Sequence, residues 1–151
     1  MSYFTAKTQF EHGENPKIGV LLCNLGTPQA PEPGAVRRYL AEFLSDKRVV
    51  EAPRWIWKPI LHGIILRIRP RLSAAAYKKV WGEQGSPLLA ISNEQTREVN
   101  AALNDQHQDS FAVALGMRYG EPSIASALQT LREQDARQIV VLPLYPQYAS
   151  A

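Results

Sequence analysis

The chain has 151 residues, of which 45% are hydrophobic and 21% charged, and this composition is typical of one soluble globular domain. Its single cysteine, Cys23, excludes an internal disulfide and a metal cage made of cysteines alone, so we expect a reducing compartment. The net charge of +3 is unevenly distributed. Between Lys47 and Lys79 nine bases and one acid give +8, and the other eight bases and thirteen acids give −5.

The chain begins with a polar segment, for which we predict a flexible tail over residues 1–16. The first fifteen residues contain no apolar stretch as long as that of a signal peptide, and they are not rich in arginine. We therefore expect a cytoplasmic protein with a loosely held N-terminus.

The elements that follow are predicted from apolar spacing. A continuous apolar run at 18–25 predicts a buried strand, and residues 34–43 carry apolar side chains at helical spacing. Residues 54–66 and 72–81 predict two helices separated by a break at Arg69-Pro70. Ser86 and Pro87 are a natural N-cap and first residue for a helix that runs to about residue 103.

The last third of the chain repeats this alternation. We predict strands at 111–117 and 138–144, with a helix over 121–134 between them that has Pro122 near its start. None of the three strands alternates apolar and polar residues, which is typical of parallel strands covered on both faces. The fold class is therefore α/β, with a doubly wound parallel sheet and right-handed crossovers.

The segment at 54–71 is both apolar and basic, and places Trp55 and Trp57 among arginines and lysines. This combination suggests a membrane surface, a nucleic acid or an apolar ligand that bears carboxylates. The alternative is a core helix with a solvated basic face. No apolar run approaches the roughly 20 residues that cross a bilayer.

Ligands of open parallel sheets bind beyond the carboxyl ends of the strands. The loops that follow the predicted strands are 24–29, 116–122 and 143–150, and the helix that starts at Ser86 begins at the same edge. Tyr145 and Tyr148 are therefore candidate cleft residues. Ordinary turns and surface residues remain the alternative for Gly26-Thr27-Pro28 and for Arg118 and Tyr119.

Several common sites are excluded. The sequence has no Walker motif, no G-x-G-x-x-G and no G-x-S-x-G. His12, His62 and His107 have no second ligand at metal-binding spacing, so a local zinc site is not expected. Cys23, at a strand end, is interpreted as a small core residue.

Five stretches together resemble the N-terminal half of bacterial ferrochelatases, which insert ferrous iron into protoporphyrin to make heme. They are GVLLCNLGTP (19–28), AVRRYLAEFLSDKRVV (35–50), VWGEQGSPL (80–88), LGMRYGEPS (115–123) and VVLPLYPQYAS (140–150). The resemblance implies one Rossmann/flavodoxin-like half, residues 17–151, of a two-domain chelatase fold with a porphyrin cleft between the halves.

The resemblance also implies site residues. Arg69, Tyr77 and Ser86 match positions that contact the porphyrin and its propionates, and Arg118 and Tyr119 match an Arg-Tyr pair close to the macrocycle. Leu25, Gln29 and Tyr145 complete the set of expected porphyrin contacts. Gln29 stands where some relatives have a tyrosine near the metal, and Ala149 precedes Ser150 where many relatives have serine directly.

The family's catalytic histidine and glutamate belong to the second half, so we expect no catalytic and no metal-binding residue in this chain. Ferrous iron and protoporphyrin IX are the implied substrates, with no tightly bound cofactor, and the missing C-terminal half is an implied partner. Self-association and contact of 54–71 with a membrane are further expectations; nucleic acid is not an expected partner. The alternatives are a stand-alone porphyrin- or heme-binding module and a peripheral membrane or nucleic-acid binder.

Overall fold

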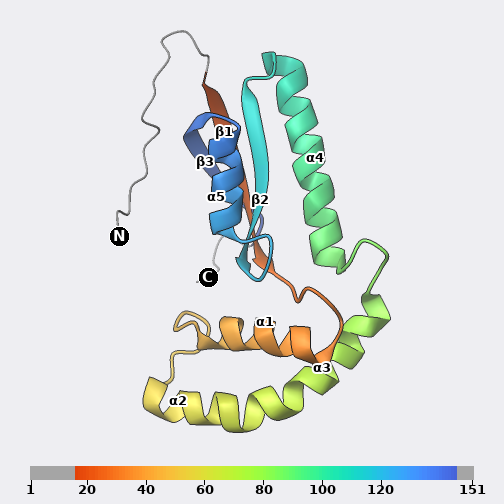
Figure 1. Cartoon of the computed structure of the whole chain (residues 1–151), viewed down its shortest axis with the longest axis vertical. Coiled ribbons are helices and arrows are strands. Elements are labelled where there is room, and N and C mark those ends of the chain that lie inside the picture. The colour runs from red at the N-terminus through yellow and green to blue at the C-terminus, as the bar shows by residue number, and fades with distance from the viewer. Residues whose placement is uncertain (1–15, 146–151) are drawn as a thin grey trace.

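A computed structural model of the chain describes residues 16–145. These residues form a three-stranded sheet with a helix on each face and, across the carboxyl ends of the strands, a separate layer of helices (Figure 1). The predicted tail, apart from Pro16, and Tyr148, Ala149 and Ser150 lie outside the described residues.

The sheet is parallel throughout, in the order β2-β1-β3. The central strand β1 (Lys17–Gly26) pairs with β2 (Phe111–Tyr119) on one side and β3 (Ala136–Pro143) on the other. In this register Leu22 stands between Leu115 and Leu142. The predicted parallel α/β class is confirmed, and each predicted strand lies within two residues of an observed one.

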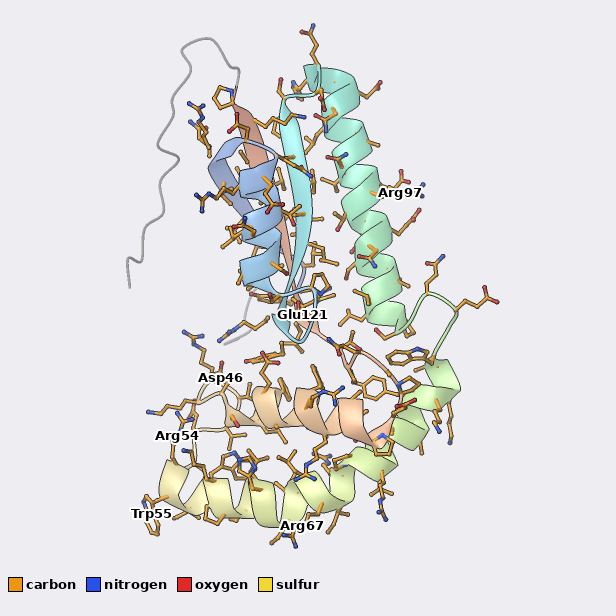
Figure 2. The ribbon with its side chains drawn as sticks, in the orientation of Figure 1. Asp46, Arg54, Trp55, Arg67, Arg97 and Glu121 are labelled. Carbon is orange, nitrogen blue, oxygen red and sulfur yellow. The ribbon has the colours of Figure 1, made fainter. Side chains whose placement is uncertain are left out.

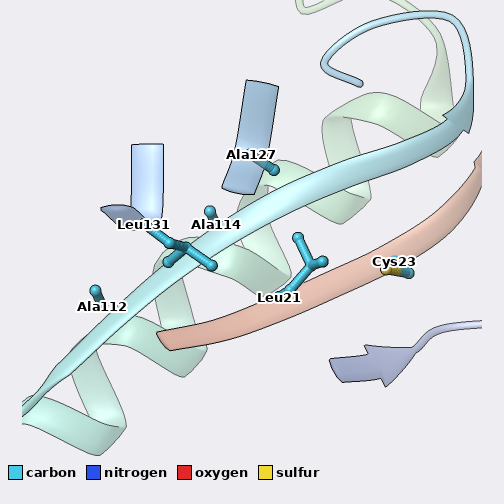
Figure 3. Packing of buried hydrophobic residues seen from close by; sticks show 6 residues of the cluster. All are labelled: Leu21, Cys23, Ala112, Ala114, Ala127 and Leu131. Carbon is cyan, nitrogen blue, oxygen red and sulfur yellow. The ribbon is translucent and has the colours of Figure 1, made fainter. Parts of the chain in front are cut away.

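Alternate residues of the central strand enter two different cores. On one face, α5 (Ile124–Glu133) covers a cluster that consists of Leu21, Cys23, Ala112, Ala114, Ala127 and Leu131 (Figure 3). On the other face, α4 (Pro87–His107) covers Val20, Leu22, Leu115 and Met117, with Leu89 and Leu103 packed against them. Cys23 is 5% exposed, which confirms its interpretation as a small core residue.

Strand β3 differs from the prediction that every strand is covered on both faces. Ile139, Val140, Val141 and Leu142 are 41%, 54%, 55% and 46% exposed. The reason is that α4 packs on β2 and β1, and α5 mainly on β2, so within residues 16–145 both faces of β3 stay largely open. Among residues 16–145, β3 is hydrogen-bonded to β1 alone and forms one edge of the sheet.

The helical arm, residues 33–80, is the second layer. It consists of α1 (Pro33–Ser45), α2 (Arg54–Ile60), the π-helix η1 (Leu61–Ile65) and α3 (Leu66–Val80). α2, η1 and α3 follow one another without interruption and pack along α1 (Figure 1). Within the described residues, no helix is both long enough and apolar enough to cross a membrane.

The predicted break at Arg69-Pro70 is wrong, because α3 runs through Pro70. A proline ring in a helix clashes with the carbonyl four residues earlier, here that of Leu66. Leu66 departs from helical geometry, with φ −72° and ψ −4°, and this turns its carbonyl away from the regular position. Pro70 is therefore accommodated and lies buried in the arm.

The π-helix keeps one face of the arm against α1. The fully buried residues of α2, η1 and α3 are Leu61, Leu66, Pro70 and Ala74. Their spacing is four residues except for one step of five, from Leu61 to Leu66, which falls on the π-helix. A π-turn takes up one more residue than an α-turn, so the covered face stays aligned.

Candidate functional site

The ends of β1 and β2 approach each other so closely that only glycine fits. Gly26 has φ +113°, and a Cβ there would lie 1.8 Å from the carbonyl oxygen of Tyr119. Gly120 has φ +80°, and its Cβ would lie 2.9 Å from the carbonyl oxygen of Thr27. The loops after β1 and β2 are thus brought together, as the parallel sheet predicted.

A hollow of about 230 Å³ lies where these two loops meet α1. Its lining residues are Thr27, Pro28, Gln29, Ala35, Arg38, Tyr39, Glu42, Gly120, Glu121 and Ser123. Ligand pockets usually have about 300–1,000 Å³. The hollow is therefore too small for a porphyrin and can serve only as one wall or one end of a larger site.

Two tyrosines of the arm bind the loop after β1. The hydroxyl of Tyr39 donates to the carbonyl oxygen of Gly26 at 3.2 Å, and the phenol of Tyr77 is hydrogen-bonded to the side chain of Thr27. Burial, together with Tyr77, Tyr119 and Glu42 nearby, raises the pKa of Tyr39 to about 12. Burial also raises the pKa of Tyr77. Both phenols therefore stay neutral at physiological pH.

A carboxylate after α1 binds the end of β2. Asp46, labelled in Figure 2, accepts from Arg118 Nη2 at 2.7 Å and from the Tyr119 hydroxyl at 3.1 Å, both through Oδ2. The backbone N–H of Arg48 donates to Oδ1 at 2.9 Å. That hydrogen bond, with Tyr119 and the positive charges of Arg118 and Arg48, lowers the pKa of Asp46. The carboxylate is therefore charged at neutral pH.

The N-terminus of α4 lies at the same edge of the sheet, as predicted. The hydroxyl oxygen of Ser86 accepts from the N–H of Leu89 at 3.2 Å, which confirms Ser86 as the N-cap. Six residues further along α4, the hydroxyl of Ser92 accepts from the amide of Asn24, near the end of β1, at 3.0 Å in a buried contact. Ser86 is 1% exposed.

The remaining predicted residues are more dispersed. Arg69 is exposed on α3, Leu25 is half-buried at the end of β1, and Gln29 is exposed at the rim of the hollow. Tyr145 packs against the core on the α5 side of the sheet, whereas Ser86 begins the helix on the other face. The structure therefore brings Arg118 and Tyr119 together at Asp46 and links Tyr77 to the loop after β1 through Thr27. Arg69, Ser86 and Tyr145 take no part in these contacts.

Sequence reasoning missed Tyr39, Glu42 and Asp46, although all three lie in the stretch 35–50. The carboxylate of Glu42 accepts from the N–H of Gly120 at 3.0 Å, one turn before Asp46. The spacing of three and four residues from Tyr39 to Glu42 and Asp46 places these groups along one side of α1. This spacing was the only available signal for the two acids, since Arg118 and Gly120 are more than 70 residues away from them along the chain.

Comparison with known proteins gives one consistent result. A family model described as Ferrochelatase matches residues 17–151. The chain is 54% identical over 148 residues to a "Ferrochelatase" of Alcanivorax borkumensis, which covers 98% of this chain and 43% of the relative. It is 59% identical over 140 residues to "Ferrochelatase 2" of Shewanella oneidensis, covering 92% and 42%. The chain spans about two-fifths of the length of these curated relatives.

Proposed function

The chain belongs to the ferrochelatase family, and on that premise we propose that it forms the porphyrin-facing N-terminal domain of an enzyme of heme biosynthesis. The reaction is the insertion of ferrous iron into protoporphyrin IX, with iron and porphyrin as substrates. The observation that carries this proposal is the meeting of the β1 loop, the β2 loop, the N-terminus of α4 and the arm at one edge of the sheet.

The chemistry of the ligand agrees with the residues found there. A porphyrin is a flat apolar disc with two carboxylates, and it needs aromatic or aliphatic walls with guanidinium groups at one rim. We assign the porphyrin contacts to Arg69, Tyr77, Ser86, Arg118, Tyr119, Leu25, Gln29 and Tyr145. Ser86 and Tyr119 are at most 2% exposed, so each of these two contacts involves only a small part of the side chain's surface.

Metal insertion also requires groups that accept two pyrrole protons, placed over a distorted ring. The loops 24–29 and 116–122 contain no histidine, and their only carboxylate, Glu121, accepts from the N–H of Ser123 at the start of α5 at 2.7 Å. Across residues 16–145, no three His, Cys, Asp or Glu side chains are grouped as metal ligands. We therefore propose that the catalytic groups lie outside this chain and that the chain alone does not turn over.

The test is to titrate the chain with protoporphyrin and follow the absorbance of the ligand. We expect weak binding that is reduced by Arg69→Ala with Tyr77→Ala. Arg97→Ala, on the exposed side of α4, is the matched control. No spectral change, or a change that the double variant leaves intact, would contradict the assigned site.

An assay with ferrous iron and protoporphyrin under anaerobic conditions tests the proposal that this chain alone does not insert iron. Heme formation should be absent with this chain and present with a longer relative such as that of Shewanella oneidensis. Turnover by this chain would place a proton acceptor within it, with His62 on the arm as the first candidate. Tight binding of porphyrin or heme by this chain alone, without turnover, would favour a stand-alone porphyrin- or heme-binding module.

The exposed residues of the arm support a membrane surface as an additional partner. Its outer stripe consists of Trp55, Ile56, Ile60, Ile64, Ile68 and Leu72, all between 38% and 79% exposed. Exposed Arg54, Lys58, Arg67, Arg69 and Arg71 accompany it, and residues 52–82 contain no acid. We propose that this face rests on anionic lipid, where a water-insoluble porphyrin would be found.

Binding to vesicles that contain anionic lipid tests this surface. Arg67→Glu should weaken binding roughly thirty-fold, because one charge near such a surface contributes about 1 kcal/mol and a reversal counts twice. Arg97→Glu makes the same change of charge on α4 and should have much less effect. Equal effects of the two variants would show that only net charge matters.

Self-association is the last part of the proposal. The exposed apolar residues of β3 and its free edge within residues 16–145 are a surface on which a second copy can pair. Sedimentation should show assembly that increases with concentration and is suppressed by Val140→Lys. A monomer at all concentrations would contradict self-association.

We also propose that the protein has a cytoplasmic location.

A further inference from the structure

The carboxylate of Asp46 receives hydrogen bonds from the distant end of β2 and from the backbone two residues further along the chain. Arg118 and Tyr119, at the end of β2, donate to the same oxygen, Oδ2, and Arg48 donates through its backbone to the other. The side chain of Asp46 is only 17% exposed. Such a carboxylate is held in one place before any ligand arrives.

The guanidinium of Arg118 is fixed from a second direction. Its Cζ lies 5.1 Å from the centre of the Tyr119 ring, which is a cation–π distance. The Tyr119 ring is itself held edge-on by Phe43 of α1, at 5.2 Å between centroids. The Arg118 side chain nevertheless remains 31% exposed, and a guanidinium has five N–H donors. It can therefore hold Asp46 and still donate to another anion.

A second carboxylate reinforces the arrangement. Glu42 accepts from the N–H of Gly120 at 3.0 Å, so two acids one helical turn apart bind three successive residues, 118–120. Gly120 in turn lines the hollow with Gln29 and Tyr39. The position of the loop after β2 is thus determined by α1 as well as by its own strand.

We propose that Asp46 is a positioning residue, which fixes the guanidinium of Arg118 so that its free N–H groups are ready for a carboxylate of the bound porphyrin. The inference rests on the proposed function for the identity of the ligand. An arginine that is already ordered loses less side-chain entropy on binding than a free one. Asp46 would therefore act on affinity through Arg118, without touching the ligand.

The experiment is a double-mutant cycle on the 151-residue chain, with protoporphyrin absorbance as the readout. We expect Asp46→Asn to weaken binding roughly three- to ten-fold, the range for one rotamer-rich side chain that must be ordered. In the Arg118→Ala background, Asp46→Asn should have no further effect. Glu94→Gln, which removes an exposed partner of Arg97 on α4, is the control and should leave binding unchanged.

A purely structural role gives a different result. If Asp46→Asn alone leaves affinity unchanged, or weakens it equally with and without Arg118, the positioning role is overturned. If Asp46→Asn does not fold, Arg118→Lys replaces it in the comparison, since it keeps the charge but loses the planar guanidinium whose Nη2 Asp46 binds. Unchanged affinity in Arg118→Lys would then overturn the proposal.

Hydrogen exchange separates this proposal from the proposed function. The amides of residues 118–120 should exchange faster in Asp46→Asn than in the unsubstituted chain, whether or not porphyrin binds. Faster exchange without any porphyrin binding would refute the proposed ligand, but it would support the role of Asp46 in holding residues 118–120. Unchanged exchange would refute the proposal that Asp46 holds residues 118–120 in place.

Discussion

The sheet layer and the helical arm use apolar residues in opposite ways. In the sheet layer, β1 and β2 bury both of their faces under α4 and α5, and Leu22 and Leu131 are fully buried. In the arm, only the face toward α1 is covered, and the outer stripe leaves Trp55 79% and Leu72 68% exposed. The two regions have similar amounts of apolar sequence, so composition alone does not indicate which region stabilises the fold.

The joint between them is polar. Tyr39, Glu42 and Asp46 of the arm bind Gly26, Gly120 and the Arg118-Tyr119 pair of the sheet through hydrogen bonds. Backbone contacts between α1 and β2 are few. The sheet layer thus buries both faces of two strands and the arm only one face of its helices, whereas the joint determines how the arm is placed over the carboxyl ends of the strands.

The largest effect is expected in the sheet. Leu22 is 0% exposed and lies in the middle of β1, so Leu22→Ala should lower the free energy of unfolding by about 2–5 kcal/mol, measured by urea denaturation. Leu72→Ala on the arm removes the same atoms and should cost less than about 1 kcal/mol. Equal losses at the two positions would contradict the contrast between the regions.

The next effect concerns the start of α4. Ser86→Ala removes the acceptor of the Leu89 N–H and should destabilise the chain by about 1 kcal/mol. Asn93→Ala, at the exposed position directly after Ser92 on α4, is the control and should be within about 0.5 kcal/mol of the unsubstituted chain. Thermal unfolding that ranks the two variants in reverse order would show that the cap is not what holds this helix end.

Much of the sheet layer was predictable, because its signals are local. Continuous apolar runs predicted the three parallel strands, and Ser86-Pro87 predicted the start of α4. The exposure of β3 was not predictable, since an apolar run does not reveal whether a helix covers it. The predicted break at Pro70 was wrong because the backbone conformation of Leu66 avoids the clash with the proline ring, and the sequence does not reveal that conformation. The partners of Asp46 could not be predicted because they come from another element far along the chain.

A smaller effect is expected at the joint. Tyr39→Phe removes the hydrogen bond to the Gly26 carbonyl and should cost about 0.5–1.5 kcal/mol at neutral pH. The pKa of Tyr39 is raised to about 12 in the folded chain from 10.0, so its contribution is complete below pH 10 and is lost as the pH rises toward 12. Urea denaturation across this range should show a steeper decline for the unsubstituted chain than for Tyr39→Phe. Parallel curves would contradict the burial of this phenol.

The smallest effect on stability is expected on the outer stripe of the arm. Leu72→Gln replaces an exposed side chain by one of similar helix propensity, so neither burial nor the helix is much affected. The free energy of unfolding should change by less than about 0.5 kcal/mol, because a side chain that is 68% exposed buries little apolar surface that the substitution could remove. The same substitution should weaken binding to anionic vesicles, because it removes apolar surface that would enter the lipid boundary. The control is Leu128→Gln on α5, which is 41% exposed and lies away from the arm. A loss above about 1 kcal/mol for Leu72→Gln that grows with protein concentration would show that the stripe is covered by a second copy instead of lipid.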